Sequence, residues 1–284
     1  MSRIAYVNGR YLRHTLAAVH VEDRGFQFAD GVYEVCAIRD GVLIDEGPHL
    51  ARLDRSLGEL RMRAPLEKSS LRFLMREVVR RNRVRDGLVY IQVSRGQARR
   101  DHGFPDASVQ PTLVVTARSL DMNRYDDMAA KGVSVIVLPE SRWSRCDIKS
   151  TGLLANVLAK QQAREAGAFE AWFVTKEGMI TEGASTNAWI VDETGVLRTR
   201  PLGNEILPGV TRGEILSVCR QHNVKFSETP FTEDEAKKAR EAFITAATIG
   251  ALPVTQVAGV KLGDGKPGPI ALKLREIYWS TRIT

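Results

Sequence analysis

The stretch Ser141-Arg-Trp-Ser-Arg-Cys-Asp-Ile-Lys149-Ser-Thr-Gly-Leu-Leu154 places a lysine between two segments of different periodicity. Before it, residues 132–138 form an apolar, β-branched run that predicts a buried strand. After it, residues 152–166 predict a helix. Lys149 therefore lies at a strand-to-helix junction, from which a side chain can point into a cleft. Position alone is weak evidence for catalysis, because most lysines are solvated surface groups.

A carboxylate in a second segment gives this lysine a chemical partner. Met179-Ile-Thr-Glu182-Gly-Ala-Ser-Thr-Asn187 sets Glu182 ahead of small and hydroxyl residues and an apolar strand. A tight turn is the simpler explanation of a Glu-Gly pair alone. Beside a lysine able to form a Schiff base, however, a carboxylate can keep a pyridine nitrogen protonated and so make the ring an electron sink.

The first part of the chain mixes strands and helices that are partly segregated. Asn8-Gly9 and Asp40-Gly41 each sit between apolar runs, a pattern typical of hairpins. Leucines at three- and four-residue spacing from residue 50, and again from residue 71, predict two helices. Strands are expected at residues 88–93 and 112–116. The pattern indicates an α+β fold.

The second part is expected to follow a polar connector at residues 118–127. Further strands are predicted at 171–174, 188–191 and 242–245, and a last amphipathic helix from about 269. A helix over 211–222 is expected to begin with a capping box formed by Thr211 and Glu214. With 284 residues, two domains are expected, at 1–120 and 121–284.

Composition excludes several classes of protein. Hydrophobic residues at 43% and charged residues at 26% are typical of a globular chain. The N-terminus lacks an apolar signal core and no run of about 18 apolar residues occurs, so we expect a cytoplasmic protein that does not enter membranes. The three cysteines are far apart and no metal-ligand spacing is present, so neither disulfides nor a metal site is expected.

Two further patterns have plain structural explanations. The net charge is +7, and the densest basic cluster is Arg80, Arg81, Arg83 and Arg85. This cluster ends an amphipathic segment without interleaved aromatic residues, so a solvated helix end is favoured over a nucleic-acid site. Gly263, Gly265 and Gly268 spell GxGxxG, but only 16 residues follow, too few for a dinucleotide-binding unit. A turn before the last helix is expected instead.

The order of these motifs resembles a known family. Arg52, then Arg-Cys-Asp-Ile-Lys149-Ser, then Thr-Glu182-Gly-Ala-Ser-Thr-Asn187, then Leu207-Pro-Gly-Val-Thr211-Arg is similar to the class IV aminotransferases of fold type IV. Within that family, the stretch from Asp23-Arg-Gly to Tyr33-Glu and the block around the lysine are most like the D-amino acid transaminases. The resemblance implies a two-domain α+β enzyme with pyridoxal 5'-phosphate between the domains. It also implies a homodimer.

The resemblance assigns a role to each candidate residue. Lys149 would carry the cofactor as a Schiff base and move the proton between substrate Cα and cofactor. Glu182 would pair with the pyridine nitrogen. Arg52 would bind the phosphate, helped by the backbone N–H groups of Val210 and Thr211 at a helix start. Tyr33 would lie near the bound substrate.

One segment departs from the family pattern. Thr245-Ala-Ala-Thr248 places alanine where a phosphate-binding hydroxyl is common in the family. Backbone amides or the Thr248 hydroxyl could take its place.

The substrate depends on Arg95-Gly-Gln-Ala-Arg-Arg100-Asp-His102-Gly-Phe-Pro105. Arg100 and His102 share a side if the backbone is extended, and together they could grip an α-carboxylate. An exposed basic loop is the structural alternative, and Arg99 could face inward in place of Arg100. The segment resembles the carboxylate-binding RxHxFP of D-amino acid transaminases, which implies D-alanine as donor and 2-oxoglutarate or pyruvate as acceptor.

Other activities stay open at this point. Branched-chain L-amino acid transamination and the lyase reaction on aminodeoxychorismate use the same scaffold and would share Lys149 and Glu182. They would differ in the residues that bind the substrate α-carboxylate, here Arg100 and His102, which we call the carboxylate trap. A non-catalytic basic binding protein is the alternative from another class, and it predicts salt-sensitive nucleic-acid binding without turnover.

Overall fold

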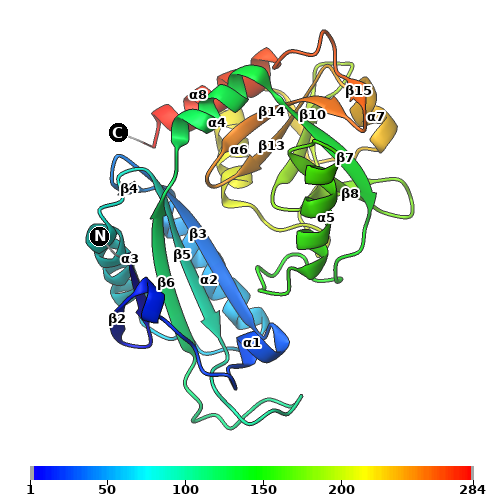
Figure 1. The fold of residues 1–284 in the computed structure, drawn as a ribbon. Helices are drawn as coiled ribbons and strands as arrows, with labels where there is room; N and C mark the ends of the chain where they lie inside the picture. Colours follow the sequence, from blue (N-terminus) through cyan, green and yellow to red (C-terminus); the bar gives the residue numbers. More distant parts are fainter. Residues whose placement is uncertain (1–2, 283–284) are drawn as a thin grey trace. The chain divides into compact units, whose positions relative to one another are not determined.

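The computed structural model describes residues 3–282, which divide into two compact units. The first contains the residues up to Asp121 together with Ile148–Gly152, and the second contains Met122–Asp147 and the residues from Leu153 onward. The segment that carries Lys149 therefore groups with the first unit, whereas the sequence places it in 121–284. The mixture of helices and strands in each unit confirms the α+β class (Figure 1).

A six-stranded sheet forms the centre of the first unit within the described residues. Its order is β2 (Arg10–Arg13), β1 (Ile4–Val7), β6 (Thr112–Ser119), β5 (Gly87–Ser94), β3 (Gly31–Arg39) and β4 (Val42–Leu43). All pairs are antiparallel. Both hairpins expected from the sequence are present, since Asn8-Gly9 joins β1 to β2 and Asp40-Gly41 joins β3 to β4 with positive φ at all four residues.

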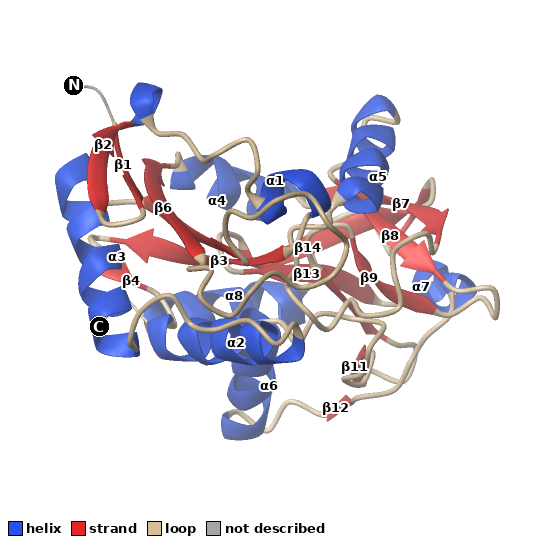
Figure 2. Cartoon of the chain, turned by 90° about the horizontal axis from the view of Figure 1, so that it is seen from below, coloured by secondary structure: helices blue, strands red, loops and turns tan. Residues whose placement is uncertain are grey.

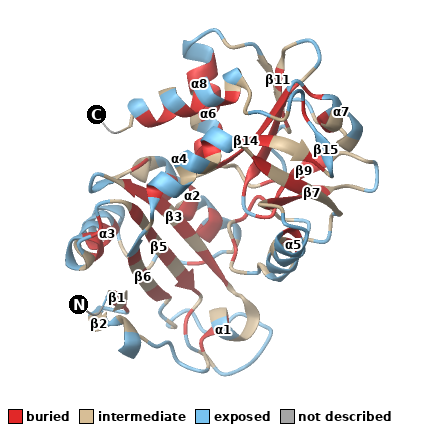
Figure 3. Ribbon diagram, turned by 45° about the horizontal axis from the view of Figure 1, so that its top comes forward, coloured by how far each residue is buried: buried red, intermediate tan, exposed pale blue. Residues whose placement is uncertain are grey.

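Two helices cover one face of this sheet. They are α2 (Glu46–Glu59) and α3 (Lys68–Asn82), preceded by the short η1 (His14–Leu16) and α1 (Arg24–Phe28). Alternate residues of β5 are buried, and Val89, Ile91 and Val93 join the leucines of α2 and α3 in one core. Figure 3 shows this alternation along β5 and β6. The two helices expected from the leucine spacing are therefore confirmed.

The second unit contains a nine-stranded mixed sheet within the described residues. Its order is β12 (Phe226–Ser227), β11 (Leu197–Thr199), β10 (Asn187–Val191), β13 (Glu241–Ala246), β14 (Gly250–Val257), β7 (Val133–Pro139), β8 (Glu170–Val174) and β9 (Ile180–Gly183), with β15 (Val260–Lys261) on β14. Its helices are α4 (Met122–Lys131), α5 (Leu154–Glu165), α6 (Val210–Gln221), α7 (Glu233–Lys238) and α8 (Pro269–Ser280).

These helices lie against different parts of the second sheet. α5 packs on β7 and β8, as Figures 1 and 2 show, and α8 packs on β14. Residues 140–153 therefore join β7 to α5, which confirms the strand-to-helix junction around Lys149. None of the helices within residues 3–282 combines the length and apolar character needed to cross a membrane.

Two local predictions were wrong. The expected connector at 118–127 is largely helix α4, which buries Met122 and Ala129 although half of its residues are polar or charged. Thr211 is not a helix cap, because α6 begins after Gly209 and Thr211 lies inside its first turn. The capping box in this unit is formed by Thr232 and Glu235 at α7. The strands β14 and β15 were not anticipated.

The glycine motif near the C-terminus forms a turn, as expected. Gly263 and Gly265 have positive φ in the connection between β15 and α8, and Gly268 precedes the first turn of α8. The Glu241 carboxylate accepts hydrogen bonds from the backbone N–H groups of Ile270 and Ala271 at this helix start. An added Cβ at Gly268 would lie 2.1 Å from that carboxylate, which explains the need for glycine there.

Candidate active site

The backbone around Lys149 is fixed to strand β3. Lys149 O accepts a hydrogen bond of 3.0 Å from Tyr33 N, and Thr151 N donates to Gly31 O at 2.9 Å. Between these two bonds, Val32 and Ser150 form an antiparallel bridge. The chain around Lys149 is thus anchored, so its side chain starts from a defined backbone position.

The side chain of Lys149 lies over Tyr33. Its Nζ is 4.1 Å from the centroid of the Tyr33 ring, and the Tyr33 ring stacks on Tyr90 at 5.6 Å. The backbone N–H of Lys149 donates to Ser56 Oγ on α2 at 3.3 Å. The lysine and the tyrosine that the sequence assigned to one site are therefore in contact.

Arg52 is held by a buried carboxylate that the sequence did not reveal. Its Nε donates to Glu34 Oε1 at 2.7 Å and its Nη2 donates to Glu34 Oε2 at 2.9 Å, while His49 Nδ1 lies 2.8 Å from Oε2. Burial raises the pKa of Glu34, but the Arg52 guanidinium and the His49 hydrogen bond outweigh it and lower this pKa to about 2. Glu34 is therefore ionised, and it fixes the plane of the Arg52 guanidinium.

A signal for this cluster is visible in the sequence once the strand is known. Val32, Glu34 and Cys36 alternate along β3 and all face the core. A carboxylate on an apolar strand face requires a buried partner. His49 and Arg52 lie three residues apart on α2, among its buried leucines, and so supply that partner.

In the second unit, Glu182 is buried and surrounded by donors. Its Oε1 accepts hydrogen bonds from Arg142 Nη1 at 2.6 Å and from Leu207 N at 3.0 Å, and its Oε2 accepts one from Asn187 Nδ2 at 2.9 Å. The Asn187 amide also donates to Leu207 O at 3.0 Å. These contacts fix the orientation of the carboxylate at the end of β9.

Arg142 is a second residue that the sequence did not single out. Burial lowers its pKa, but the Glu140 hydrogen bonds and the Glu182 charge raise it above the ordinary value, so the guanidinium stays charged. Arg142 lies seven residues before Lys149, between the predicted strand and the predicted helix, so no periodic pattern in the sequence marked it as buried. The thiol of Cys146, in the same segment, has a pKa raised to about 12, mainly by burial. It is therefore protonated at neutral pH.

The start of α6 has the features of an anion site. Val210 and Thr211 occupy its first turn, where backbone N–H groups lack partners within the helix. Thr211 is 3% exposed, and its Oγ1 has no hydrogen-bond partner among the described residues. A buried hydroxyl without a partner is costly, so this position suits a ligand with acceptor oxygens. An added Cβ at Gly209 would lie 2.0 Å from Asn187 Oδ1, so the residue before α6 packs closely against the asparagine that also donates to Glu182.

The predicted carboxylate trap lies on an exposed loop of the first unit. The Arg100 guanidinium carbon is 4.6 Å from the centroid of the Phe28 ring, and the His102 ring is 5.5 Å from it. The two side chains thus gather on one aromatic ring. Arg99, the alternative, makes no hydrogen bond, ion pair or ring contact with the described residues. Of the two arginines, Arg100 is therefore the one that shares a contact with His102, the Phe28 ring.

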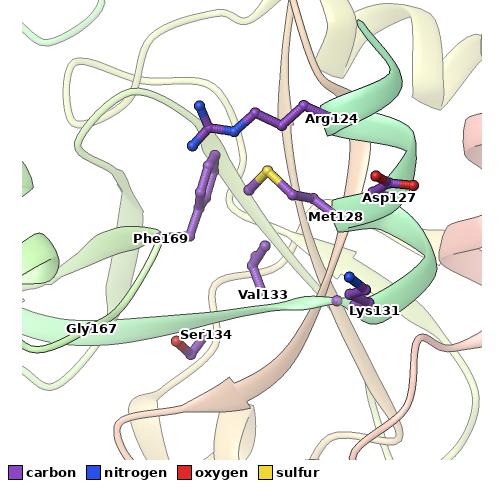
Figure 4. Close-up of a pocket in the computed structure, with 9 residues that line it drawn as sticks. Arg124, Asp127, Met128, Lys131, Val133, Ser134, Gly167 and Phe169 are labelled. Atoms are coloured by element: carbon purple, nitrogen blue, oxygen red, sulfur yellow. The ribbon is translucent and has the colours of Figure 1, made fainter. Parts of the chain in front are cut away.

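A separate pocket of about 460 Å³ lies in the second unit beside α4. Arg124 and Met128 extend from α4 toward Phe169, with Asp127 and Lys131 on the same helix (Figure 4). None of the residues predicted from the sequence to bind cofactor or substrate lines this pocket. It is therefore no part of the candidate active site.

The arginine cluster expected to be a solvated helix end is largely paired within the chain. Arg80 and Arg81 both contact Glu77, and Arg85 contacts Asp40. These pairs lie at the exposed end of α3 and in the turn that follows it.

Comparison with known proteins identifies relatives that match nearly the whole chain. A D-alanine aminotransferase from Bacillus licheniformis is 40% identical over 263 residues, which cover 93% of this chain and 91% of that protein. A D-alanine aminotransferase from Staphylococcus haemolyticus is 36% identical over 95% of both chains. A solved structure of a branched-chain aminotransferase from Thermoproteus uzoniensis with norvaline has a TM-score of 0.84 at 26% identity, over 98% of this chain and 94% of that one.

The match to a family extends through both units. The model of the family "amino-transferase class IV" covers residues 31–257, which include Lys149, Glu182 and the start of α6. Together with the two relatives at 36% and 40% identity, this match is sufficient to assign the family. The chain belongs to the class IV aminotransferases, which are pyridoxal phosphate enzymes.

Proposed function

We propose that this chain is a D-amino acid transaminase. It takes the amino group from D-alanine and other D-amino acids and gives it to a 2-oxo acid such as 2-oxoglutarate or pyruvate, in a ping-pong reaction. Two relatives named D-alanine aminotransferase, at 40% and 36% identity over nearly the whole chain, support the donor class. The substrates are small molecules.

The residues of the chain fit pyridoxal 5'-phosphate. The unpartnered Thr211 Oγ1 and the free N–H groups at the start of α6 suit a phosphate. Arg52 adds a guanidinium whose orientation Glu34 fixes. Glu182, held by Arg142 and Asn187, is the carboxylate for the pyridine nitrogen. We therefore assign Arg52, Val210, Thr211 and Glu182 to cofactor binding.

Lys149 is the catalytic residue of the proposal. Its ε-amino nitrogen would hold the cofactor and, once released, would move the proton at substrate Cα. Bound pyridoxal phosphate supplies the electron sink for that proton transfer. The anchoring of residues 149–151 to β3 limits where the amine can reach, and Tyr33 under it restricts the side approached by substrate.

The observation that carries the choice of D-amino acids is the placement of Arg100 and His102 on one ring, Phe28. Arginine offers a two-pronged contact to a carboxylate and histidine adds a further donor. Holding the α-carboxylate on one side of the cofactor ring decides which hand of amino acid presents its Cα hydrogen to Lys149. Arg100 and His102 are thus the proposed determinants of stereochemistry.

The branched-chain and lyase activities remain the second candidates. The similarity to the branched-chain aminotransferase from Thermoproteus uzoniensis, at 26% identity, is weaker than the 40% identity to a relative named D-alanine aminotransferase. A homodimer located in the cytoplasm completes the proposal. In such a dimer, Arg100 and His102 could serve the neighbouring subunit's site.

Reduction of the purified protein with sodium borohydride tests the cofactor part of the proposal. Peptide mapping should place a pyridoxyl group on the peptide that contains Lys149. Lys149→Ala should remain unlabelled, whereas Lys273→Ala, a change at an exposed lysine, should label like the unchanged protein. Labelling of a different lysine would contradict the assignment of Lys149.

A further inference from the structure

The loop that carries Arg100 and His102 has few attachments to the rest of the first unit. Its base is fixed by backbone hydrogen bonds from Arg24 N to Gly96 O at 2.9 Å and from Ala98 N to Glu22 O at 3.3 Å. Residues 99–104 are all exposed. An exposed loop without further attachment would sample many conformations, and substrate binding would have to order it.

One buried side chain supplies the missing attachment. Arg24 is 4% exposed, and its Nη1 donates to Asp101 O at 2.6 Å. Among the described residues, this is the one hydrogen bond that joins residues 99–105 to a residue outside them. Asp101 lies between Arg100 and His102, so the bond fixes the backbone at the centre of the proposed carboxylate trap.

The same guanidinium contacts the ring on which the trap rests. The Arg24 guanidinium carbon is 4.8 Å from the Phe28 centroid, and the Arg100 guanidinium carbon is 4.6 Å from the same centroid. The charge of Arg24 is paired with Asp30, which accepts a 2.8 Å hydrogen bond from Arg24 Nε. Burial raises the pKa of Asp30, but hydrogen bonds from Arg95 and then Arg24 lower it overall, so the carboxylate stays ionised.

Asp30 also joins Arg24 to the beginning of the loop. It accepts hydrogen bonds from Arg95 Nε at 2.8 Å and from Arg95 Nη2 at 2.9 Å. The Arg95 guanidinium carbon in turn lies 3.8 Å from the Phe104 ring centroid. The loop is therefore held at its start, middle and end by one network centred on the Asp30 carboxylate.

We propose that Arg24 is the positioning residue of the substrate carboxylate trap, holding Arg100 and His102 in the conformation that binds an α-carboxylate. It acts through Asp101 O and Phe28 and does not itself touch substrate. This inference rests on the proposed D-amino acid transaminase function. It predicts that Arg24 affects the capture of substrate and leaves the chemistry at Lys149 unchanged.

Arg24→Lys in the holoenzyme is the direct test. Lysine keeps the charge beside Asp30 but cannot reach both Asp30 and Asp101 O with one planar fork. Losing a charge-assisted hydrogen bond should raise the KM for D-alanine roughly tenfold, with kcat changed less than about twofold. The control Arg76→Lys, on the exposed side of α3, should leave both constants unchanged.

Trypsin provides a readout that does not depend on activity. Arg99 and Arg100 are exposed cleavage sites, so a loosened loop should give fragments ending at these residues several times faster in Arg24→Lys than in Arg76→Lys. If Arg24→Lys proves unstable, Phe28→Leu tests the same idea. It removes the ring under Arg100 and His102, leaves the Arg24–Asp101 bond, and should also raise KM.

A double variant separates this inference from the proposed function. If Arg24 acts through Arg100 and His102, adding Arg24→Lys to Arg100→Ala should raise KM by a smaller factor than Arg24→Lys does in the unchanged protein. Three results would each overturn the inference. They are effects of the two substitutions on KM that multiply fully in the double variant, an unchanged KM in Arg24→Lys, and a raised KM in Arg24→Lys without faster cleavage by trypsin. If Arg100→Ala by itself leaves KM unchanged, the proposed carboxylate trap is wrong, whatever Arg24 does to the loop.

Discussion

Glu34 holds Arg52 through both of its carboxylate oxygens, at 2.7 Å to Nε and 2.9 Å to Nη2. Glu34 is fully buried, and Arg52 is 9% exposed. Removing either charge would leave the other buried without a partner, so the pair holds the Arg52 guanidinium in one orientation. It orients the guanidinium that we propose for the cofactor phosphate, while His49 takes part from one turn earlier on α2.

Glu34→Gln should lower stability in a pH-dependent way. Because the folded pKa of Glu34 is about 2 and its ordinary value is 4.5, its contribution is fully present above pH 4.5 and is lost as the pH falls toward 2. At pH 7 the variant should lose about 3 kcal/mol, since Arg52 becomes a buried charge without a counter-ion. Denaturant unfolding across this pH range measures the difference.

The matched control for Glu34 is Glu59→Gln, on an exposed part of the same helix as Arg52. Its change in unfolding free energy should stay below about 0.5 kcal/mol at every pH. A difference between Glu34→Gln and the unchanged protein that stays constant from pH 7 to pH 2 would show that Glu34 is not ionised by its partners.

Arg100→Ala should weaken substrate binding more than Arg99→Ala does. Removing a charge-assisted contact to a carboxylate is expected to raise the KM for D-alanine roughly tenfold to a hundredfold, with a smaller effect on kcat. Arg99→Ala removes the same charge one position away, so the pair of variants separates a specific contact from general attraction. Steady-state kinetics with D-alanine and 2-oxoglutarate measure both. A larger effect of Arg99→Ala would move the trap to that residue.

Thr211→Val should weaken cofactor binding without lowering the stability of the cofactor-free protein. The Thr211 hydroxyl has no partner among the described residues, so replacing it by a methyl group should leave the stability of the cofactor-free protein unchanged or slightly higher. Losing a hydrogen bond to a charged phosphate should weaken pyridoxal phosphate binding roughly tenfold. Fluorescence titration gives the affinity and thermal unfolding gives the stability.

Thr211→Ser is the control for that pair of measurements, because it keeps the hydroxyl. It should bind the cofactor within a few-fold of the unchanged protein. Cofactor binding in Thr211→Val as tight as in the unchanged protein would show that the hydroxyl does not contribute to phosphate binding.

The helices and strands that were predicted from the sequence are those with a regular pattern of apolar residues along their own length. Alternating apolar residues located β5, and leucine spacing located α2 and α3, because these patterns follow from one buried face. Helix α4 was missed because polar residues predominate in residues 118–127, where a connector was expected, and the buried Met122 and Ala129 are seven residues apart. Thr211 was taken for a cap because its spacing to Glu214 is right, whereas Gly209 ends the preceding loop two residues earlier.

The candidate site could be predicted only in part, for a physical reason. Lys149 and Glu182 follow from chemistry that needs both an amine and a carboxylate. The residues that orient Arg52 and Glu182 depend on contacts between elements distant in the chain. Glu34 meets Arg52 only because β3 packs on α2, and Arg142 reaches Glu182 across 40 residues of sequence. No local pattern encodes such pairs.

The visible absorbance spectrum of the purified protein, before and after addition of a D-amino acid, tests whether the chain is a D-amino acid transaminase. We expect a yellow protein whose absorbance band bleaches with D-alanine and not with L-alanine or L-leucine. Bleaching with L-leucine alone would keep the cofactor on Lys149 but contradict the proposed donor. A protein that remains colourless after addition of pyridoxal phosphate would contradict the roles assigned to Lys149, Glu182 and Arg52 together.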